Sequence, residues 1–255
     1  MTGRMRLAWI SFFTPAEGFQ ASILRYTSGE TMNWEQAMRA LIIDFDGLIL
    51  DTEMPDYLSW QEVYQAYGVE LPMDLWCSIV GGDADSDFEP HEYLEARLHS
   101  QVDREQIWVS RRKSYLEHLE SLPILPGVQQ LLDDAKQLGL KLAIASSSPE
   151  NWVAGHLTRL GLSRYFDSVV TADDVAATKP DPALFLLAAE KVGAKPDEVI
   201  VFEDSNNGVR GAKRAGMYVV VVPNEVTRHM DLSMADLRLE SLEELRLKEI
   251  LESVQ

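Results

Sequence analysis

The amino-acid sequence predicts an α/β fold, in which a Rossmann-like, doubly wound parallel sheet forms the core and an all-helical cap domain is inserted after the first strand. Three observations lead to this prediction. From residue 39 onward, short apolar runs alternate with segments of helical periodicity, which is typical of parallel strands that helices bury on both faces. The interval 54–123 breaks this alternation and shows helical patterns without a convincing strand. The chain has 255 residues, which is enough to bury a large core without disulfides.

Five short apolar runs are expected to be strands, because each has the length and residue types of a buried strand. They lie at residues 40–44, 141–145, 168–171, 199–202 and 218–222. The helices expected between them repeat an apolar residue every three or four positions. They lie at residues 128–138, 152–160, 182–192 and 208–215. Doubly wound sheets bind ligands beyond the carboxyl ends of their strands, so we expect a functional site at that edge.

The predicted domain organisation has three parts. Residues 38–53 and 124–255 form the α/β core, and residues 54–123 form the cap. The helices of the cap are expected at residues 57–67, 91–99 and 107–119. Residues 1–37 carry three Arg and three Glu and are neutral overall. Their apolar stretch is short and no cleavage pattern follows it, so we expect an irregular leader rather than a targeting signal.

Charge and composition exclude several classes of partner. With 41 Asp and Glu against 23 Lys and Arg, the formal net charge is −18, and such acidity disfavours nucleic acids and anionic membranes. No apolar run approaches the roughly 18 residues of a membrane span. The single cysteine, Cys77, rules out a disulfide framework and fits a reducing compartment. We therefore expect a cytoplasmic monomer or weak dimer whose partner is a small molecule.

Acidic residues follow the first and the fourth expected strands. Asp44 and Asp46 leave the first strand on the same side, and Gly47 lets the backbone turn sharply away. An Asp pair alone is more often a helix cap or a turn, but the longer string D-x-D-G-x-x-x-D-T is much more specific. Glu203 and Asp204 follow the fourth strand. Two adjacent acids are unusual there unless they meet a cation, and their hard oxygen atoms suit Mg²⁺.

Hydroxyl groups and a lysine follow other strands. Ser146, Ser147 and Ser148 come directly after the second strand and offer hydroxyls and backbone amides to an oxyanion, although serines before a helix are commonly N-caps. Lys179 precedes a helix that begins with proline, from where its ammonium can reach the cleft. A lone lysine is usually solvated surface, so neither signal is specific by itself.

The four motifs together, in this order and at this spacing, resemble those of the haloacid dehalogenase-like hydrolase superfamily. The resemblance is to its β-phosphoglucomutase-like and phosphatase group with a small helical cap, and it covers about residues 38–245. It implies that Asp44 is the nucleophile that forms an aspartyl-phosphate. It also implies that Asp46 acts first as general acid and then as general base, a role worth about 10²–10⁴-fold in rate.

The same resemblance implies a metal ion and a phosphate site. Mg²⁺ would be held by Asp44, the backbone carbonyl of Asp46 and Asp204, with Glu203 in support. Ser146 and Ser147 would bind the phosphoryl group, and Lys179 would bridge the phosphate and the nucleophile. A carboxylate that attacks a phosphate dianion meets strong repulsion, which a divalent cation and a lysine can offset.

The distribution of charge along the sequence helps to decide between a phosphatase and a phosphosugar mutase. No Lys or Arg occurs between Arg39 and Arg97, an interval that holds 14 Asp and Glu. A phosphosugar mutase needs a cation for the second phosphate of its bisphosphate. In β-phosphoglucomutases the cap carries an arginine in the stretch that corresponds to residues 80–85, and this sequence has no Lys or Arg there. Near the hinge between core and cap, at residues 54–58, the mutases carry a histidine and this sequence carries Asp56. We therefore expect a Mg²⁺-dependent phosphatase acting on a small sugar or polyol phosphate.

Two other functions remain open at this stage: a β-phosphoglucomutase-like mutase, and a non-catalytic phosphoryl-binding regulator, against which the complete set of site residues argues. For the phosphatase, we expect the loop 79–82 and the helix around Tyr57 and Trp60 to close over the substrate and exclude water. The basic run 111–113 is expected to be a solvated helix face, with a contact to substrate phosphate as the alternative. The acidic run 83–87 imitates the start of a calcium loop but lacks its glycine and its glutamate, so we expect a solvated loop.

Overall fold

The computed structural model describes residues 38–79 and 88–254. Within these ranges, six strands form one sheet in the order β3-β2-β1-β4-β5-β6, and every neighbouring pair is parallel. The strands are β1 Ala40–Ile43, β2 Lys141–Ala145, β3 Ser168–Val170, β4 Val199–Glu203, β5 Tyr218–Val221 and β6 Leu237–Arg238. The prediction of an α/β fold with a parallel sheet is confirmed. Strand β6 was not among the predicted strands; it is two residues long and lies at the edge of the sheet.

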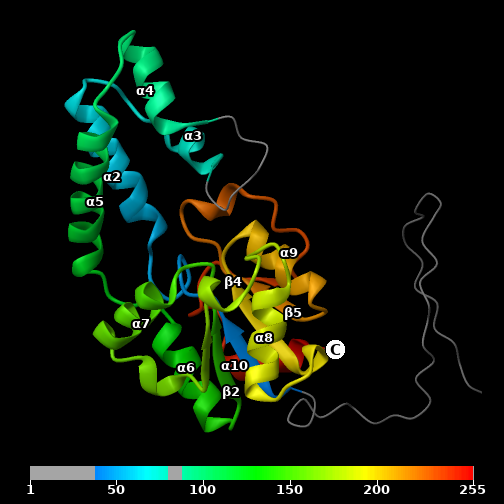
Figure 1. Cartoon of the computed structure of the whole chain (residues 1–255). Helices are drawn as coiled ribbons and strands as arrows, with labels where there is room; N and C mark the ends of the chain where they lie inside the picture. Colours follow the sequence, from blue (N-terminus) through cyan, green and yellow to red (C-terminus); the bar gives the residue numbers. More distant parts are fainter. Residues whose placement is uncertain (1–37, 80–87, 255) are drawn as a thin grey trace, which may run out of the picture. The chain divides into compact units, whose positions relative to one another are not determined.

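Helices cover both faces of the sheet, so the strands are buried on both sides (Figure 1). Side chains alternate along β1: Leu41 and Ile43 pack with one apolar cluster, and Ala40 and Ile42 with another. The first cluster includes residues of α6, α7 and α10, and the second includes residues of α8 and α9. These helices are α6 Val128–Gln137, α7 Glu150–Arg159, α8 Ala183–Val192, α9 Asn206–Arg214 and α10 Leu247–Ser253. Helix α10 was not among the predicted helices.

Short 3-10 helices connect several of these elements. They lie at Ser163–Tyr165, Ala172–Asp174, Pro196–Glu198 and Thr227–His229. The last of them follows β5 on the side of the sheet where β1 and β4 also end, so it contributes to the site described below.

Four helices are described between β1 and α6, and we call them the helical cap (Figure 1). They are α2 Glu53–Ala66, α3 Met73–Cys77, α4 Pro90–Leu98 and α5 Arg104–Glu120. Helices α2 and α5 pack along each other, and large aromatic residues such as Tyr64 and Trp76 fill the space between the cap helices. Val226, from the core loop after β5, is buried in the same apolar cluster. The cap therefore has a core of its own that also contacts the α/β domain.

One expectation about the cap differs from the structure. The first cap helix begins at Glu53, four residues before the expected start, which brings its N-terminal turn to the edge of the sheet. The helix around Tyr57 and Trp60, which we expected over the substrate, lines the cavity with its first turn, whereas the side chains of Tyr57 and Trp60 are buried inside the cap. Their rings face the apolar interior because burial of aromatic surface there is favourable. The runs 80–85 and 83–87 lie outside the described residues.

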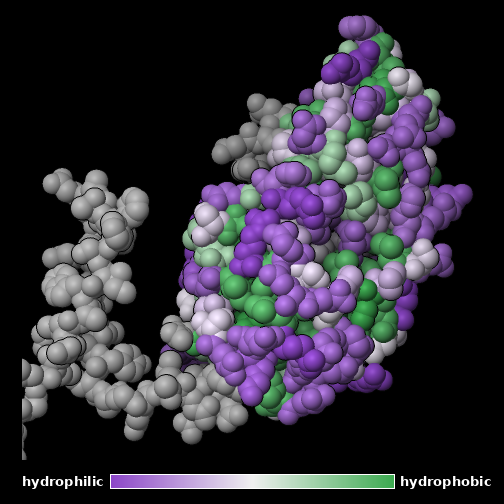
Figure 2. Space-filling view, turned by 180° about the vertical axis from the view of Figure 1, so that it is seen from behind, coloured by the Kyte–Doolittle hydropathy of each residue, from purple (hydrophilic) through white to green (hydrophobic). Residues whose placement is uncertain are grey.

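Hydrophilic residues predominate on the face shown in Figure 2, where hydrophobic residues occur in small groups. Among the described residues, no helix combines the length and the apolar character that crossing a membrane requires.

Candidate active site

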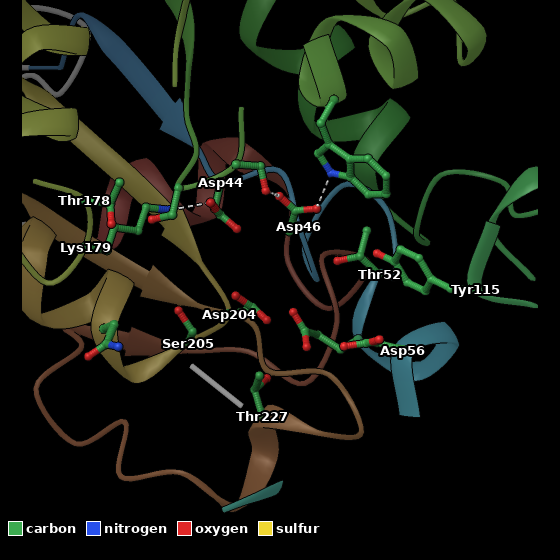
Figure 3. Close-up of a pocket in the computed structure, with 15 residues that line it drawn as sticks. Asp44, Asp46, Thr52, Asp56, Tyr115, Thr178, Lys179, Asp204, Ser205 and Thr227 are labelled. Carbon is green, nitrogen blue, oxygen red and sulfur yellow. Dashed lines mark hydrogen bonds and ion pairs between the residues drawn. The ribbon is translucent and has the colours of Figure 1, made fainter. Parts of the chain in front are cut away.

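A cavity of about 420 Å³ lies where the carboxyl ends of the strands meet the first turn of α2 (Figure 3). Its walls come from segments far apart in the sequence, including the ends of β1, β2 and β4 and the cap helices α2 and α5. Its lining is mostly polar and includes Asp44, Asp46, Ser147, Lys179 and Asp204. The expectation of a site at this edge of the sheet therefore agrees with the position of the cavity.

Asp44 and Asp46 are positioned by the end of β1. The backbone N–H of Asp44 donates to the carbonyl of Phe202 at 3.0 Å, which continues the pairing of β1 with β4 by one residue. Gly47 then turns the chain with a φ of 78°, a conformation that residues with a Cβ rarely adopt. A Cβ at Gly47 would lie 2.7 Å from Nδ2 of Asn224 and closer still to Asp204. The glycine is required both by the turn and by this close approach.

Lys179 is buried between two acidic side chains. Its ammonium donates to Asp44 Oδ1 and to Glu203 Oε1, the latter at 2.6 Å, and its side chain is 6% exposed. Burial alone would lower the pKa of Lys179, but the charges of Asp44 and Glu203 outweigh it and raise the pKa. Lys179 therefore keeps its positive charge inside the site. The dashed line in Figure 3 marks its contact with Asp44.

Glu203 is fixed by the start of α9. Its Oε2 accepts hydrogen bonds from the backbone N–H groups of Asp204 and Ser205 and from the Ser205 hydroxyl, at 3.1–3.3 Å. Any side chain at Gly208, in the first turn of the helix, would overlap with the carboxylate of Glu203. A carboxylate at a helix N-terminus is also stabilised by the helix dipole. Glu203 thus holds one orientation, in which its other oxygen meets Lys179.

Three buried carboxylates form a cluster that can hold a metal ion. One oxygen each of Asp44, Glu203 and Asp204 lies within 4.8 Å of the others. Burial raises the pKa of Asp44 well above its ordinary value, with Lys179 opposing the rise and Glu203 adding to it. Burial likewise raises the pKa of Asp204, with Glu203 and Asp44 as further causes. Three acids next to one lysine leave excess negative charge, so the donor set fits a hard divalent cation.

Asn224 connects two parts of this cluster. Its amide nitrogen donates to Oδ2 of Asp204 at 2.8 Å and to the carbonyl of Gly47 at 3.3 Å. Its amide oxygen accepts from the backbone N–H groups of Val226 and Thr227. The side chain therefore links the position of Asp204 to the turn after β1. Asn224 was not among the predicted site residues, because a single asparagine after a strand is an ordinary turn residue.

Asp46 is held by hydrogen bonds to both of its carboxylate oxygens. Oδ2 accepts from the hydroxyl of Ser148 at 2.7 Å and from that of Ser146 at 3.3 Å, and Oδ1 accepts from Nε1 of Trp152 at 2.9 Å. Ser147 lines the cavity, whereas Ser146 is fully buried beside Asp46. Trp152 was not among the predicted site residues, because an aromatic residue in a helix usually belongs to the hydrophobic core.

The cap contributes an acidic wall to the cavity. Glu53 and Asp56, from the first turn of α2, line it together with Tyr115 of α5. Burial, together with the charges of Asp46, Asp56 and Asp51, raises the pKa of Glu53 to about 8. The sequence offered a signal for Glu53, which directly follows the D-x-D-G-x-x-x-D-T string.

The basic run 111–113 differs from the expected solvated face. Arg111 forms an ion pair with Asp56, its side chain is only 19% exposed, and its guanidinium lies 5.3 Å from the centre of the Trp60 ring. Arg112 lies over the ring of Tyr115. Lys113 is exposed and pairs with Glu117, as expected of a solvated face. The prediction was wrong for Arg111, because α5 turns this residue toward the first turn of α2.

Fold and site together define a haloacid dehalogenase-type hydrolase, and the comparison with known families agrees. The chain belongs to the haloacid dehalogenase-like hydrolase family, whose model matches residues 41–222. This range contains all the catalytic, phosphate-binding and metal-binding residues that the sequence predicted. The predicted membership of this superfamily is confirmed.

Comparisons with individual proteins indicate which group of the family this chain is most similar to. The chain is 45% identical to "Putative phosphatase YhcW" of Bacillus subtilis over 84% of its length and 97% of the relative. It is 34% identical to "Phosphorylated carbohydrates phosphatase" of Thermotoga maritima, covering 71% of the chain and 82% of the relative. The chain is also similar to a solved structure, "putative beta-phosphoglucomutase from Thermotoga maritima", with 31% sequence identity and a TM-score of 0.69. The match covers 86% of this chain and 100% of the solved chain. The prediction of an enzyme of the phosphatase group is confirmed.

Proposed function

We propose that this protein is a Mg²⁺-dependent phosphatase that hydrolyses a small sugar or polyol phosphate through an aspartyl-phosphate. The observation that carries the proposal is the buried contact of Lys179 with Asp44, beside Asp204 and with Asp46 two residues further along the same loop. This arrangement supplies a carboxylate nucleophile, a fixed positive charge and a second carboxylate for proton transfer.

In the proposed first step, a carboxylate oxygen of Asp44 attacks the phosphorus atom. The bond from phosphorus to the leaving oxygen breaks, and Asp46 donates a proton to that oxygen, which departs as an alcohol. In the second step Asp46 takes a proton from water, which attacks the phosphorus and releases Asp44 and inorganic phosphate. Lys179 stays charged throughout and offsets negative charge on the phosphoryl oxygens.

We propose that Asp44, Asp204 and the carbonyl of Asp46 hold Mg²⁺, and that Glu203 serves mainly to orient Lys179. The hydrogen bonds to both oxygens of Glu203 support this division of roles. When bound, the ion would reduce the repulsion between the nucleophile and a phosphate dianion. The exposed groups of Ser147 would receive the phosphoryl oxygens next to Asp46, whereas the buried hydroxyl of Ser146 donates to Asp46 and would need to turn to reach them.

The leaving group is proposed to be a neutral polyhydroxy compound. Glu53 and Asp56 face the cavity from α2 and can form hydrogen bonds with hydroxyl groups, whereas a second phosphate there would lie next to the carboxylate of Asp56. The relative named a phosphorylated carbohydrates phosphatase supports this substrate class. Arg111 is the cation nearest to Asp56, but it is already paired with it. This pairing favours the phosphatase over a mutase, which needs a free cation for a second phosphate.

The single cysteine, Cys77, is a free thiol and supports a proposed cytoplasmic location. The net charge of −18 supports small metabolites rather than nucleic acids as partners.

The test is phosphate release from a panel of sugar, polyol and carboxylic-acid phosphates, with Mg²⁺ or with EDTA. We expect turnover of neutral sugar or polyol phosphates that requires Mg²⁺ and is abolished by Asp44→Asn. No release from any ester by the wild-type protein would contradict the proposal. Conversion of β-glucose 1-phosphate to glucose 6-phosphate with a bisphosphate activator, in preference to hydrolysis, would favour the mutase.

A further inference from the structure

We propose that Trp152 and Tyr115 form an aromatic pair that positions the carboxylate of Asp46 for proton transfer. Trp152 belongs to α7 of the core, and Tyr115 belongs to α5 of the cap. The inference rests on the proposed phosphatase function, because it assigns the pair a part in the departure of the leaving alcohol. Both residues line the same cavity as Asp46.

Both carboxylate oxygens of Asp46 accept hydrogen bonds, from different kinds of donor. Among the described side chains, two hydroxyls donate to Oδ2, and the indole N–H of Trp152 is the donor to Oδ1. The terminal torsion of an aspartate is broad, so donors on one oxygen alone leave the plane of the carboxylate free to turn. The indole group therefore holds the second oxygen and fixes the plane.

The two kinds of donor to Asp46 differ in their freedom to change partners. A serine hydroxyl can rotate and can accept as well as donate, so Ser148, which lines the cavity, can turn toward a bound phosphoryl group. The indole nitrogen of Trp152 carries one hydrogen and cannot accept. The bond from Trp152 to Asp46 is therefore the contact that persists when the hydroxyls change partners.

The indole ring of Trp152 is held by neighbouring rings. The ring of Tyr115 is nearly parallel to that of Trp152, with 8° between the planes and 5.9 Å between the centres. His156 meets Trp152 edge-on at 4.4 Å and 73°. The guanidinium of Arg112 lies 5.6 Å from the centre of the Tyr115 ring and 5.8 Å from that of Trp152. The indole thus has a cap residue and a core residue as ring neighbours, which restrict its plane.

This arrangement makes the acid–base group depend on the cap. Since Tyr115 comes from α5, the cap supplies part of the support that orients Trp152, and Trp152 in turn orients Asp46. The proton moves from Asp46 to the leaving oxygen while the bond between that oxygen and phosphorus breaks, and the electron pair of that bond stays on the oxygen. Misalignment of the carboxylate weakens this transfer and leaves the attack by Asp44 in place.

The kinetic test uses leaving groups that differ in their need for a proton. Trp152→Phe keeps an aromatic ring next to Tyr115 and removes the indole N–H. For a sugar phosphate, whose alkoxide leaves poorly, we expect kcat/KM to fall about 10- to 100-fold, a part of the full general-acid effect. For p-nitrophenyl phosphate, whose phenolate leaves without a proton, we expect less than about a threefold change. Tyr115→Ala should show the same difference between the two substrates to a smaller degree, and Tyr115→Phe, which keeps the ring, should retain wild-type kcat/KM on both.

Trp108→Phe is the matched control, because Trp108 lies on the exposed side of α5 at 59% exposure. It should leave both substrates unaffected. An equal loss on both substrates in Trp152→Phe, or no loss on either, would overturn the proposal while the phosphatase function stands. Absence of turnover by the wild-type protein would instead count against the proposed function.

A second measurement tests the contact without turnover. The indole ¹⁵N–¹H NMR signal of Trp152 is assigned by its loss in Trp152→Phe. We expect this signal to shift in Asp46→Ala, which removes its acceptor, and in Tyr115→Ala, which removes its ring neighbour, but not in Trp108→Phe. A signal that stays in place in both Asp46→Ala and Tyr115→Ala would overturn the proposal.

Discussion

Lys179 and Glu203 form a buried ion pair in which Nζ lies 2.6 Å from Oε1, with the glutamate side chain fully inaccessible to solvent. Such a pair is costly to form in a low-dielectric interior, and breaking it leaves an uncompensated charge. The hydrogen bonds from the start of α9 to Oε2 of Glu203 reduce that cost. The pair places the ammonium group at Asp44, where the proposed chemistry begins.

Glu203→Gln is therefore expected to affect both stability and catalysis. The substitution keeps the shape but removes the charge, so we expect a loss of about 2 kcal/mol in the free energy of unfolding. We also expect a lower kcat, because Lys179 loses one of its two acidic partners. Urea unfolding and steady-state kinetics measure the two effects, with Glu190→Gln on the exposed side of α8 as the control. Wild-type stability and kcat in Glu203→Gln would contradict this role.

Asn224→Ala is expected to weaken Mg²⁺ binding by about tenfold, as is typical when a partner of a metal ligand is removed. The amide nitrogen of Asn224 donates to Asp204, so its loss lets this carboxylate turn away from the proposed ion. Isothermal titration with Mg²⁺ reports affinity independently of turnover. The exposed Asn151 on α7 provides the control Asn151→Ala. An unchanged affinity in Asn224→Ala would show that Asp204 needs no such support.

Glu53 is expected to make the protein less stable as the pH rises. Its pKa is raised from 4.5 to about 8, chiefly by burial, so the folded state binds the proton more tightly than the unfolded state. Its stabilising contribution is therefore fully present below about pH 4 and is lost as the pH rises through about 8. Glu53→Gln cannot ionise and should gain about 2–4 kcal/mol relative to wild type between about pH 5 and pH 9.

Urea unfolding in EDTA at several pH values measures this difference, because EDTA removes the contribution of bound metal. Parallel pH profiles for Glu53→Gln and the wild-type protein would show that Glu53 titrates near its ordinary pKa.

Asp56→Asn is expected to release Arg111 for a second phosphate. In the wild-type protein the two side chains pair, and Arg111 also contacts the ring of Trp60. We expect the KM for a sugar bisphosphate to fall about fivefold, which corresponds to about 1 kcal/mol, while the KM for the monophosphate changes little. The double variant Asp56→Asn, Arg111→Gln should lose this gain. An equal response of both substrates to Asp56→Asn would argue against the released arginine.

The sequence allowed the sheet and the predicted catalytic residues to be inferred together, because the carboxyl ends of parallel strands meet at one edge. Asp44 and Asp204 each stand just beyond such an end, and Lys179 lies in the longer connection between β3 and α8. Contact between them follows from the topology and does not depend on details of packing.

The contacts that helix side chains make at the site could not be inferred in this way. Arg111 meets Asp56 across 55 positions of the sequence, and Trp152 meets Asp46 across 106. Each contact depends on how a helix is rotated against the elements that it packs on, which neither composition nor periodicity specifies. The strand β6 was missed for a different reason, since two residues carry no detectable alternation.

The central claim is that Asp44 carries the phosphoryl group during turnover. The most direct measurement is a rapid acid quench during hydrolysis of a sugar phosphate, followed by borohydride reduction and mass spectrometry, which converts a phosphorylated aspartate to homoserine. We predict homoserine at position 44 in the wild-type protein and none in Asp44→Asn. Continued hydrolysis with no modification at position 44, or with the modification at another aspartate, would contradict the account.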